Sequence, residues 1–209
     1  MVNQILPRPL ATGVHPTDRT KKLMPENSHL IDLIQKRWSP RSFNGKEVEA
    51  WKLQTVIEAA GWAASCFGEE PWRFILASRA DKPQFDRILA LLMPKNQEWA
   101  QHAGALAISA AKKTFSHAPM PNRFGLHDAG TAFGQLSLQA VALGLQVHGM
   151  GGFNADGART EFAIPDDFEV GAAFAIGYLD GDGAPPDGRK RRPLSEIVFT
   201  GGWGKPAAF

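Results

Sequence analysis

The feature that most constrains the fold is the segment at residues 127–143, which is apolar on nearly every side. Its apolar members recur at helical spacing and mix small with large side chains: Ala129, Ala132, Phe133, Leu136, Leu138, Ala140 and Leu143. A helix of this kind is buried on most of its faces, either in a core or against another subunit. Gly144 ends the predicted helix, and a strand begins at residues 145–147.

The rest of the chain alternates predicted helices with short apolar strands. Helices are expected near residues 30–34, 48–63, 84–92, 97–103 and 156–162, and strands at 73–78, 105–111 and 170–178. Residues 1–27 contain four prolines before any regular period and predict an extended arm. Residues 28–209 contain no internal repeat and no compositional break. We therefore predict one α+β domain after the arm.

Composition argues against several classes of protein. The 209 residues are 44% hydrophobic and carry a net charge of +2, which suits a soluble domain and is too weak to imply a nucleic-acid partner. A single cysteine, Cys66, excludes an intramolecular disulfide and is compatible with a reducing compartment. No apolar stretch reaches the roughly 18 residues of a membrane span, and the N-terminus lacks a signal-peptide core. We expect a cytoplasmic protein with no membrane partner.

Two basic segments indicate an anion site. Residues 37–43 read R-W-S-P-R-S-F and follow the first predicted helix, while residues 189–192 read R-K-R-R. Each guanidinium presents paired planar donors that suit a phosphate group. The alternative for the first segment is a solvated helix end with basic charges at its C-terminus.

A glycine-rich turn and a lone cysteine are the other chemical candidates. Residues 148–153 read H-G-M-G-G-F at the end of a predicted strand, where the lack of bulky side chains lets a flat ligand approach the backbone. The dinucleotide fingerprint fails because Asn154 replaces its last glycine, so a plain tight turn is the alternative. Cys66 is either a nucleophile or an inert thiol. Metal-ligand and catalytic-triad motifs are missing from the sequence.

The order of these segments resembles the FMN-dependent nitroreductase family from residue 30 to about residue 200. The matching segments are, in order, R-W-S-P-R-S-F, A-A-S-C-F-G-E-E-P-W-R-F, Asn96 followed by Trp99, G-L-Q-V-H-G-M-G-G-F, and R-K-R-R-P-L-S-E-I. The resemblance implies a three-layer α-β-α sandwich with a central mixed or antiparallel sheet. It also implies an intertwined homodimer that binds FMN at its interface, with which the apolar helix at 127–143 is consistent.

The resemblance assigns roles to individual residues. Arg37, Trp38, Ser39 and Arg41 are implied to hold the phosphate and ribityl chain, and Arg189 and Arg191 to close on the same phosphate. Asn96 is implied to bind the pyrimidine edge of the flavin, and the cofactor-binding set at the ring is His148, Met150, Gly151 and Gly152. Ser65, Cys66 and Gly68 are expected from the partner protomer, and Glu70 is a further cofactor-binding residue that introduces a negative charge. The chain departs from the family's P-S-x-x-N-x-Q-P-W at Ala64, Gly68 and Glu70.

The reaction implied by the resemblance is hydride transfer from NADH or NADPH to flavin N5, then electron delivery to a nitroaromatic or quinone-like acceptor in a ping-pong mechanism. No catalytic side chain is implied. An ionised Glu70 beside the flavin would lower its reduction potential. Phe115, Met120 and Phe124 either stack on an aromatic acceptor or pack their own loop.

Two alternatives stay open. The same fold and cofactor also suit a dehydrogenation or a reductive dehalogenation, because fold does not fix chemistry. The other alternative is a non-enzymatic module that sequesters flavin, or one that binds nucleic acid through residues 189–192.

Overall fold

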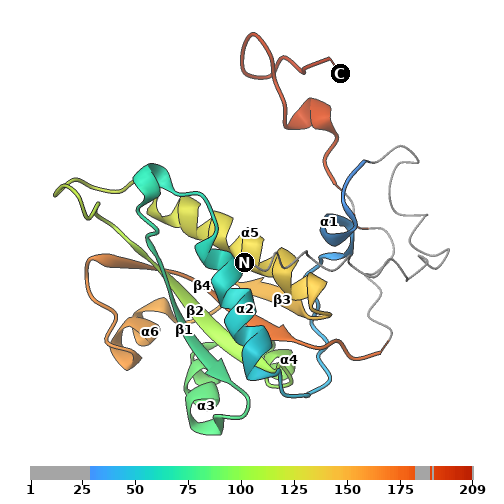
Figure 1. Ribbon diagram of the computed structural model, residues 1–209, viewed down its shortest axis with the longest axis vertical. Helices are drawn as coiled ribbons and strands as arrows, with labels where there is room; N and C mark the ends of the chain where they lie inside the picture. Colours follow the sequence, from blue (N-terminus) through green and yellow to red (C-terminus); the bar gives the residue numbers. More distant parts are fainter. Residues whose placement is uncertain (1–28, 182–188, 190, 209) are drawn as a thin grey trace, which may run out of the picture. The chain divides into compact units, whose positions relative to one another are not determined.

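The computed structural model describes residues 29–181, 189 and 191–208 (Figure 1). Residues 30–181 form one compact part, and residues 189 and 191–208 belong to another, so each is described by itself. The predicted arm at residues 1–27 lies outside the described residues.

A four-stranded antiparallel sheet forms the middle of the part at residues 30–181. Its strands are β1 (Trp72–Ser78), β2 (Ala105–Lys112), β3 (Gln146–Met150) and β4 (Phe168–Gly177), in the spatial order β1-β2-β4-β3. The register places Ile108 opposite Ile75, and Ala107 opposite Phe174. The order makes β3 an edge strand. The strand predicted at residues 145–147 is longer in the structure: β3 runs to Met150 and includes Gly149, which we expected in the glycine turn.

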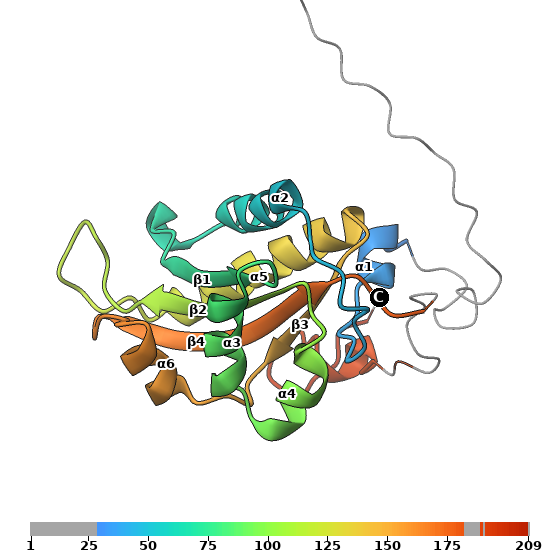
Figure 2. The ribbon, with the colours of Figure 1, turned by 90° about the horizontal axis from the view of Figure 1, so that it is seen from below.

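Helices cover both faces of this sheet, which gives the predicted three layers (Figure 2). On one face, α2 (Ala50–Gly61) and α5 (Gly125–Ala142) enclose a core built around Val56, Leu136 and Phe174. On the other face lie α3 (Lys82–Leu91), α4 (Pro94–Ala100) and α6 (Ala155–Glu161), over a core that includes Phe85 and Ile108. The short helix α1 (Asp32–Lys36) precedes the basic loop.

Local sequence explains where two of these helices begin. The Asp81 side chain accepts a hydrogen bond from the backbone N–H of Gln84 at the start of α3. The Asn154 side chain accepts one from the backbone N–H of Gly157 at the start of α6. The start predicted for α4, at residue 97, is wrong. Pro94 opens this helix instead of separating two helices, since its fixed φ suits the first turn and its missing N–H costs nothing there. Asn96 consequently lies on the helix.

Helix α5 has one packed side and one open side within residues 30–181. Ala132, Leu136 and Ala140 are fully buried, whereas Leu126, Gly130 and Gly134 are exposed. The expectation of burial on most faces is therefore not met by this part alone. Burial of the open side against another subunit stays a prediction.

The C-terminal part has local structure of its own. A single 3-10 turn, η3 (Leu194–Glu196), is followed by a bridge that pairs Phe199 with Pro206. Arg192 and Glu196 form an ion pair of 2.9 Å, which bridges adjacent turns of the backbone.

Candidate functional site

The basic loop at residues 37–41 is held against strand β3 by three hydrogen bonds. The backbone N–H of Trp38 donates to Gln146 Oε1 at 3.4 Å, and Gln146 Nε2 donates to the carbonyl of Lys36 at 3.2 Å. His148 Nδ1 lies 2.8 Å from the carbonyl of Pro40. Because a carbonyl only accepts, Nδ1 carries the proton. These bonds place the predicted anion loop beside the edge strand.

Within this loop, several donors lie close together. Arg37 donates to Ser39 Oγ at 3.4 Å, and both Ser39 and Arg41 are exposed. The indole Nε1 of Trp38 is buried and has no hydrogen-bond partner among the described residues. A buried donor of this kind is rarely left unsatisfied, which indicates a site for an acceptor atom.

The glycine turn after β3 is joined to helix α4. The carbonyl of Gly152 accepts hydrogen bonds from the Met93 N–H at 3.0 Å and from Asn96 Nδ2 at 2.9 Å. A Cβ at residue 152 would lie only 2.9 Å from Asn96 Nδ2, so glycine permits this approach. The structure thus brings the turn and Asn96 together, while their contact with a flavin stays a prediction.

Two residues that the sequence predicted at the cofactor, Met150 and His148, pack against other residues of the protein. Met150 is 3% exposed and belongs to the core that includes Phe85 and Ile108, so the whole residue is buried. The ring of His148 packs 4.6 Å from the ring of Trp99. Burial lowers the pKa of His148, although its bond to the Pro40 carbonyl opposes this effect. His148 therefore supports the loop as a neutral imidazole.

These elements together form what we call the first half-site: residues 37–41, Asn96 and residues 146–152. Its loop and Gln146 lie at the end of α5 where β3 begins, and the glycine turn and Asn96 lie at the other end of β3. Sequence reasoning missed Gln146, whose amide connects α1 to the loop. The signal was a polar amide at the start of an otherwise apolar strand, L-Q-V, where it is 7% exposed.

The segment at residues 65–70 is fixed to the start of α5. The backbone N–H of Cys66 donates to Asp128 Oδ2 at 2.9 Å, and Asp128 Oδ1 lies 3.0 Å from His127 Nδ1. Ser65 Oγ accepts from the Glu70 N–H at 3.0 Å. Asp128 is 3% exposed, and sequence reasoning missed it because a lone acid in a helical first turn resembles an ordinary dipole contact.

The same segment has an unusual backbone. Phe67, Gly68 and Glu70 have φ values of 57°, 67° and 48°, in the left-handed region. For residues other than glycine, this conformation costs about 1–2 kcal/mol of conformational energy. The result for Phe67 is a side chain that is 78% exposed and packs edge-on against Phe115 and His117, with ring centroids 5.6 and 5.3 Å away.

Glu69, which sequence reasoning passed over, is the carboxylate that organises this region. Its two oxygens accept from the Ser116 N–H at 2.9 Å and from Ser116 Oγ at 2.6 Å. These bonds lower the pKa of Glu69. Glu70 is exposed instead, and its backbone carbonyl accepts from Arg73. We call residues 65–70 and 115–128 the second half-site.

The two half-sites lie at opposite ends of α5 (Figure 1). Asp128 is in the first turn of this 18-residue helix, whereas Gln146 lies just beyond its last residue, Ala142. At about 1.5 Å per residue, the helix separates them by roughly 25 Å. A single copy of residues 30–181 therefore does not bring Ser65, Cys66, Gly68 and Glu70 to the basic loop.

Arg189 and Arg191 belong to the C-terminal part, so their approach to the basic loop stays a prediction. The described residues contain no helix long and apolar enough to cross a bilayer. They also contain no group of three or more His, Cys, Asp or Glu side chains placed to hold a metal ion.

Fold and site together define an α+β protein whose basic loop lies on the edge strand of an antiparallel sheet. The Nitroreductase family model matches residues 34–178, and the chain belongs to this family. A protein of Mycolicibacterium smegmatis described as an uncharacterized 15.4 kDa protein is 32% identical over 149 residues, which cover 64% of this chain and 99% of that protein.

Solved structures agree with this assignment. One described as an oxidoreductase containing FMN is 34% identical, with a TM-score of 0.78 over 86% of this chain and 95% of its own. A nitroreductase family protein from Clostridium difficile is 25% identical, with a TM-score of 0.69 over 84% and 99% of the two chains. A third, from Desulfovibrio desulfuricans, is described as a putative nitroreductase in complex with FMN; it is 25% identical, with a TM-score of 0.65 over 79% and 92%.

Proposed function

We propose that this protein is an FMN-dependent oxidoreductase that works as a homodimer, takes reducing equivalents from NADH or NADPH, and passes them to a nitroaromatic or quinone-like acceptor. The observation that carries the proposal is the pair of half-sites at opposite ends of α5. A two-fold arrangement of two chains would place the first half-site of one protomer against the second half-site of its partner.

The residues of the first half-site fit FMN. Arg37, Ser39 and Arg41 offer charged and hydroxyl donors to a phosphate. The buried, unpaired Nε1 of Trp38 would find an acceptor on the phosphate or the ribityl chain. Relatives described as containing FMN, at 34% and 25% identity, support this choice of cofactor. Arg189 and Arg191 would add two further cations to the phosphate.

The flat ring would lie along the glycine turn. Gly151 has no atom within 4 Å of its missing Cβ, which leaves room at the backbone for a planar ligand. Asn96 is held on α4 by its bond to Gly152, so its amide is fixed before a ligand arrives. When bound, FMN would supply the hydride and electron transfer of the reaction. The protein contributes binding, orientation and exclusion of water.

The second half-site would cover the partner's ring. Phe67 is exposed and fixed by its neighbours, and the open side of α5 at Gly130 and Gly134 would let another helix approach closely. In the loop at residues 115–124, Phe115 is buried and packs against its own loop, whereas Met120 is exposed. Met120 and Phe124 are therefore the side chains that we assign to contact an aromatic acceptor.

The test is an absorbance spectrum of the purified protein before and after anaerobic addition of NADPH or NADH, with the molar mass measured in parallel. We expect a yellow protein of twice the chain mass that is bleached by a nicotinamide nucleotide and recoloured by a nitroaromatic or a quinone. A yellow protein that neither nucleotide bleaches would instead point to another redox reaction. A colourless protein that retains DNA in a salt-dependent manner would reject the proposal.

A further inference from the structure

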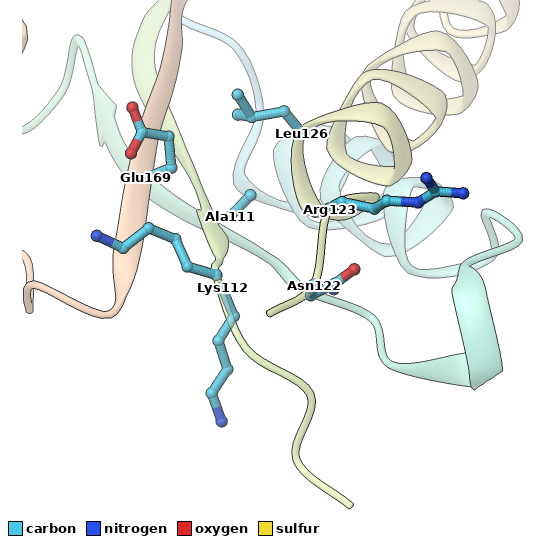
Figure 3. A pocket seen from close by; sticks show the side chains of 8 residues that line it. Ala111, Lys112, Asn122, Arg123, Leu126 and Glu169 are labelled. Atoms are coloured by element: carbon cyan, nitrogen blue, oxygen red, sulfur yellow. The ribbon is translucent and has the colours of Figure 1, made fainter. Parts of the chain in front are cut away.

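A pocket of about 210 Å³ opens at the start of α5, where the end of β2 meets β4. Strand β2 contributes Ala111 and Lys112 to the lining, and the next residue, Lys113, also lines it. The remaining lining includes Asn122 from the turn before α5, Leu126 from α5 and Glu169 from β4. Figure 3 shows Ala111, Leu126 and Glu169 around the pocket, with Asn122 in the turn. The Arg123 guanidinium extends away from it.

The pocket contains an unsatisfied hydrogen-bond donor. Asn122 is 6% exposed, its Oδ1 accepts from the Phe124 N–H at 3.1 Å, and its backbone N–H donates to the carbonyl of Lys113 at 2.6 Å. These bonds fix the orientation of the amide and leave Nδ2 buried with no partner among the described residues. Buried donors without partners are rare and indicate a missing acceptor.

Basic side chains outnumber acidic ones in the lining of this pocket. Lys112 and Lys113 line the pocket against one carboxylate, Glu169, and neither lysine forms an ion pair with a carboxylate of the described residues. Gly125, the first residue of the 18-residue α5, also lines it. A Cβ at this glycine would lie 2.7 Å from the carbonyl of Lys112, so glycine lets the first turn of α5 lie against the end of β2. The positive end of the helix dipole therefore lies beside the pocket, where the Asp128 carboxylate of the same turn partly offsets it.

We propose that this pocket binds an oxyanion, the phosphate or carboxylate group of a molecule that exchanges electrons at the neighbouring flavin. This inference rests on the proposed function, because Asn122, Gly125 and Leu126 of the second half-site line the pocket. Lys112 Nζ also donates to Ser116 Oγ, the hydroxyl that Glu69 holds. Whole ligands usually occupy pockets of about 300–1,000 Å³, so this smaller one would take a single charged group.

The test uses two changes in the full chain. The double substitution Lys112→Gln/Lys113→Gln removes both rim charges, and Asn122→Asp keeps the size of the side chain and its acceptor oxygen while replacing the unpaired donor. The control is Lys82→Gln/Arg87→Gln, which removes the same charge from α3 on the opposite face of the sheet. Steady-state KM values are measured for 4-nitrobenzoate, its neutral analogue 4-nitrobenzyl alcohol, NADH and NADPH.

If the anion belongs to the acceptor, both pocket variants raise KM for 4-nitrobenzoate by about ten-fold and leave the alcohol and the nucleotides within about two-fold. If it belongs to the nucleotide, they raise KM for the nucleotides, and a selective rise for NADPH assigns the 2′-phosphate. KM values that stay unchanged for all four molecules, or that change equally in the control, would overturn the proposal.

Failure of the proposed function gives a different result. Bound flavin and its reduction by a nucleotide are measured first on the unmodified protein. If both are missing, titration calorimetry with inorganic pyrophosphate and with benzoate tests the pocket alone. Heat of binding that the pocket variants abolish and the control retains would support an oxyanion site, and no heat with the unmodified protein would reject it.

Discussion

The two half-sites solve different structural problems. In the first, buried hydrogen bonds from Gln146 and His148 hold the loop against an edge strand, and Trp38 contributes a buried donor with no partner among the described residues. In the second, a backbone with positive φ angles leaves the Phe67 ring exposed. The carboxylates of Asp128 and Glu69 accept hydrogen bonds from Cys66 and Ser116. Each half-site has one buried donor without a partner among the described residues, Trp38 Nε1 in the first and Asn122 Nδ2 in the second. The first combines this donor with the exposed cation Arg41, whereas the second combines it with hydrogen-bonded carboxylates and the exposed ring of Phe67.

This difference indicates a division of labour. Unpaired donors and cations recognise the charged part of a cofactor, and an exposed aromatic held by its neighbours covers a flat ring. Damage to the first half-site should therefore release the cofactor and leave the fold intact. Damage to the second should weaken local structure and turnover while the cofactor stays bound.

Arg37→Ala should have the largest effect, because it removes a charged donor from the phosphate-binding loop. We expect FMN affinity to fall by about ten- to a hundred-fold, corresponding to the roughly 1.5–3 kcal/mol of a hydrogen bond to a charged group. Flavin fluorescence titration measures the affinity, and thermal unfolding monitors the fold.

Lys36→Ala is the matched control, since Lys36 is a neighbouring cation whose ammonium pairs with Asp32 at 3.5 Å. Arg191→Ala asks the same question of the C-terminal part and should also release flavin. Full FMN occupancy in both the Arg37 and Arg191 variants would return the loop to its alternative, a solvated helix end.

Asp128→Ala should act on the second half-site alone. Loss of the buried carboxylate leaves the Cys66 N–H without its acceptor, which costs about 1–3 kcal/mol of unfolding free energy. We expect this loss in urea unfolding at fixed protein concentration, together with a lower kcat/KM for the acceptor. Asp128→Asn, which keeps one oxygen, should lose less. Equal loss of FMN affinity here and in the Arg37 variant would break the comparison.

Acid should loosen the first half-site. Burial lowers the pKa of His148 from 6.5, so between 6.5 and the folded-state value the unfolded chain binds more protons. Stability contributed by neutral His148 is therefore complete above that window and is lost as the pH falls through it. His148→Asn keeps an N–H for the Pro40 carbonyl and does not titrate, so its Tm should fall less than that of the unmodified protein between about pH 7.5 and about pH 5.5. Parallel Tm profiles would show that another group is responsible.

Much of the fold was predictable because it is written in local patterns. The apolar runs at residues 73–78 and 105–111 lie in β1 and β2, and the periodic segment at 127–143 overlaps α5 to within two residues at each end. Pro94 was misread, since proline both ends one helix and suits the first turn of the next.

The candidate site was less accessible to sequence reasoning. The residue types alone indicated the basic loop and the glycine turn. In the structure, Gln146 and His148 bind the loop to β3, and Asn96 binds the turn that follows this strand. The roles of Glu69 and Asp128 could not be predicted, because they depend on contacts with residues 47 and 62 positions away in the chain. Long-range partners of this kind leave no periodic trace.

Glu70→Gln should give the smallest effect and tests whether the second half-site reaches the partner's flavin. Glu70 occupies the position where the family pattern has glutamine. Because Glu70 is exposed, solvent screens its charge. An ionised carboxylate near the ring disfavours added electrons, and its removal should raise the midpoint potential. About 0.5 kcal/mol, typical of an exposed charge, corresponds to roughly 10 mV for a two-electron couple. Glu58→Gln, an exposed position on α2, should leave the potential unchanged. A potential that Glu70→Gln leaves unaltered across a pH series would mean that this segment does not cover the ring.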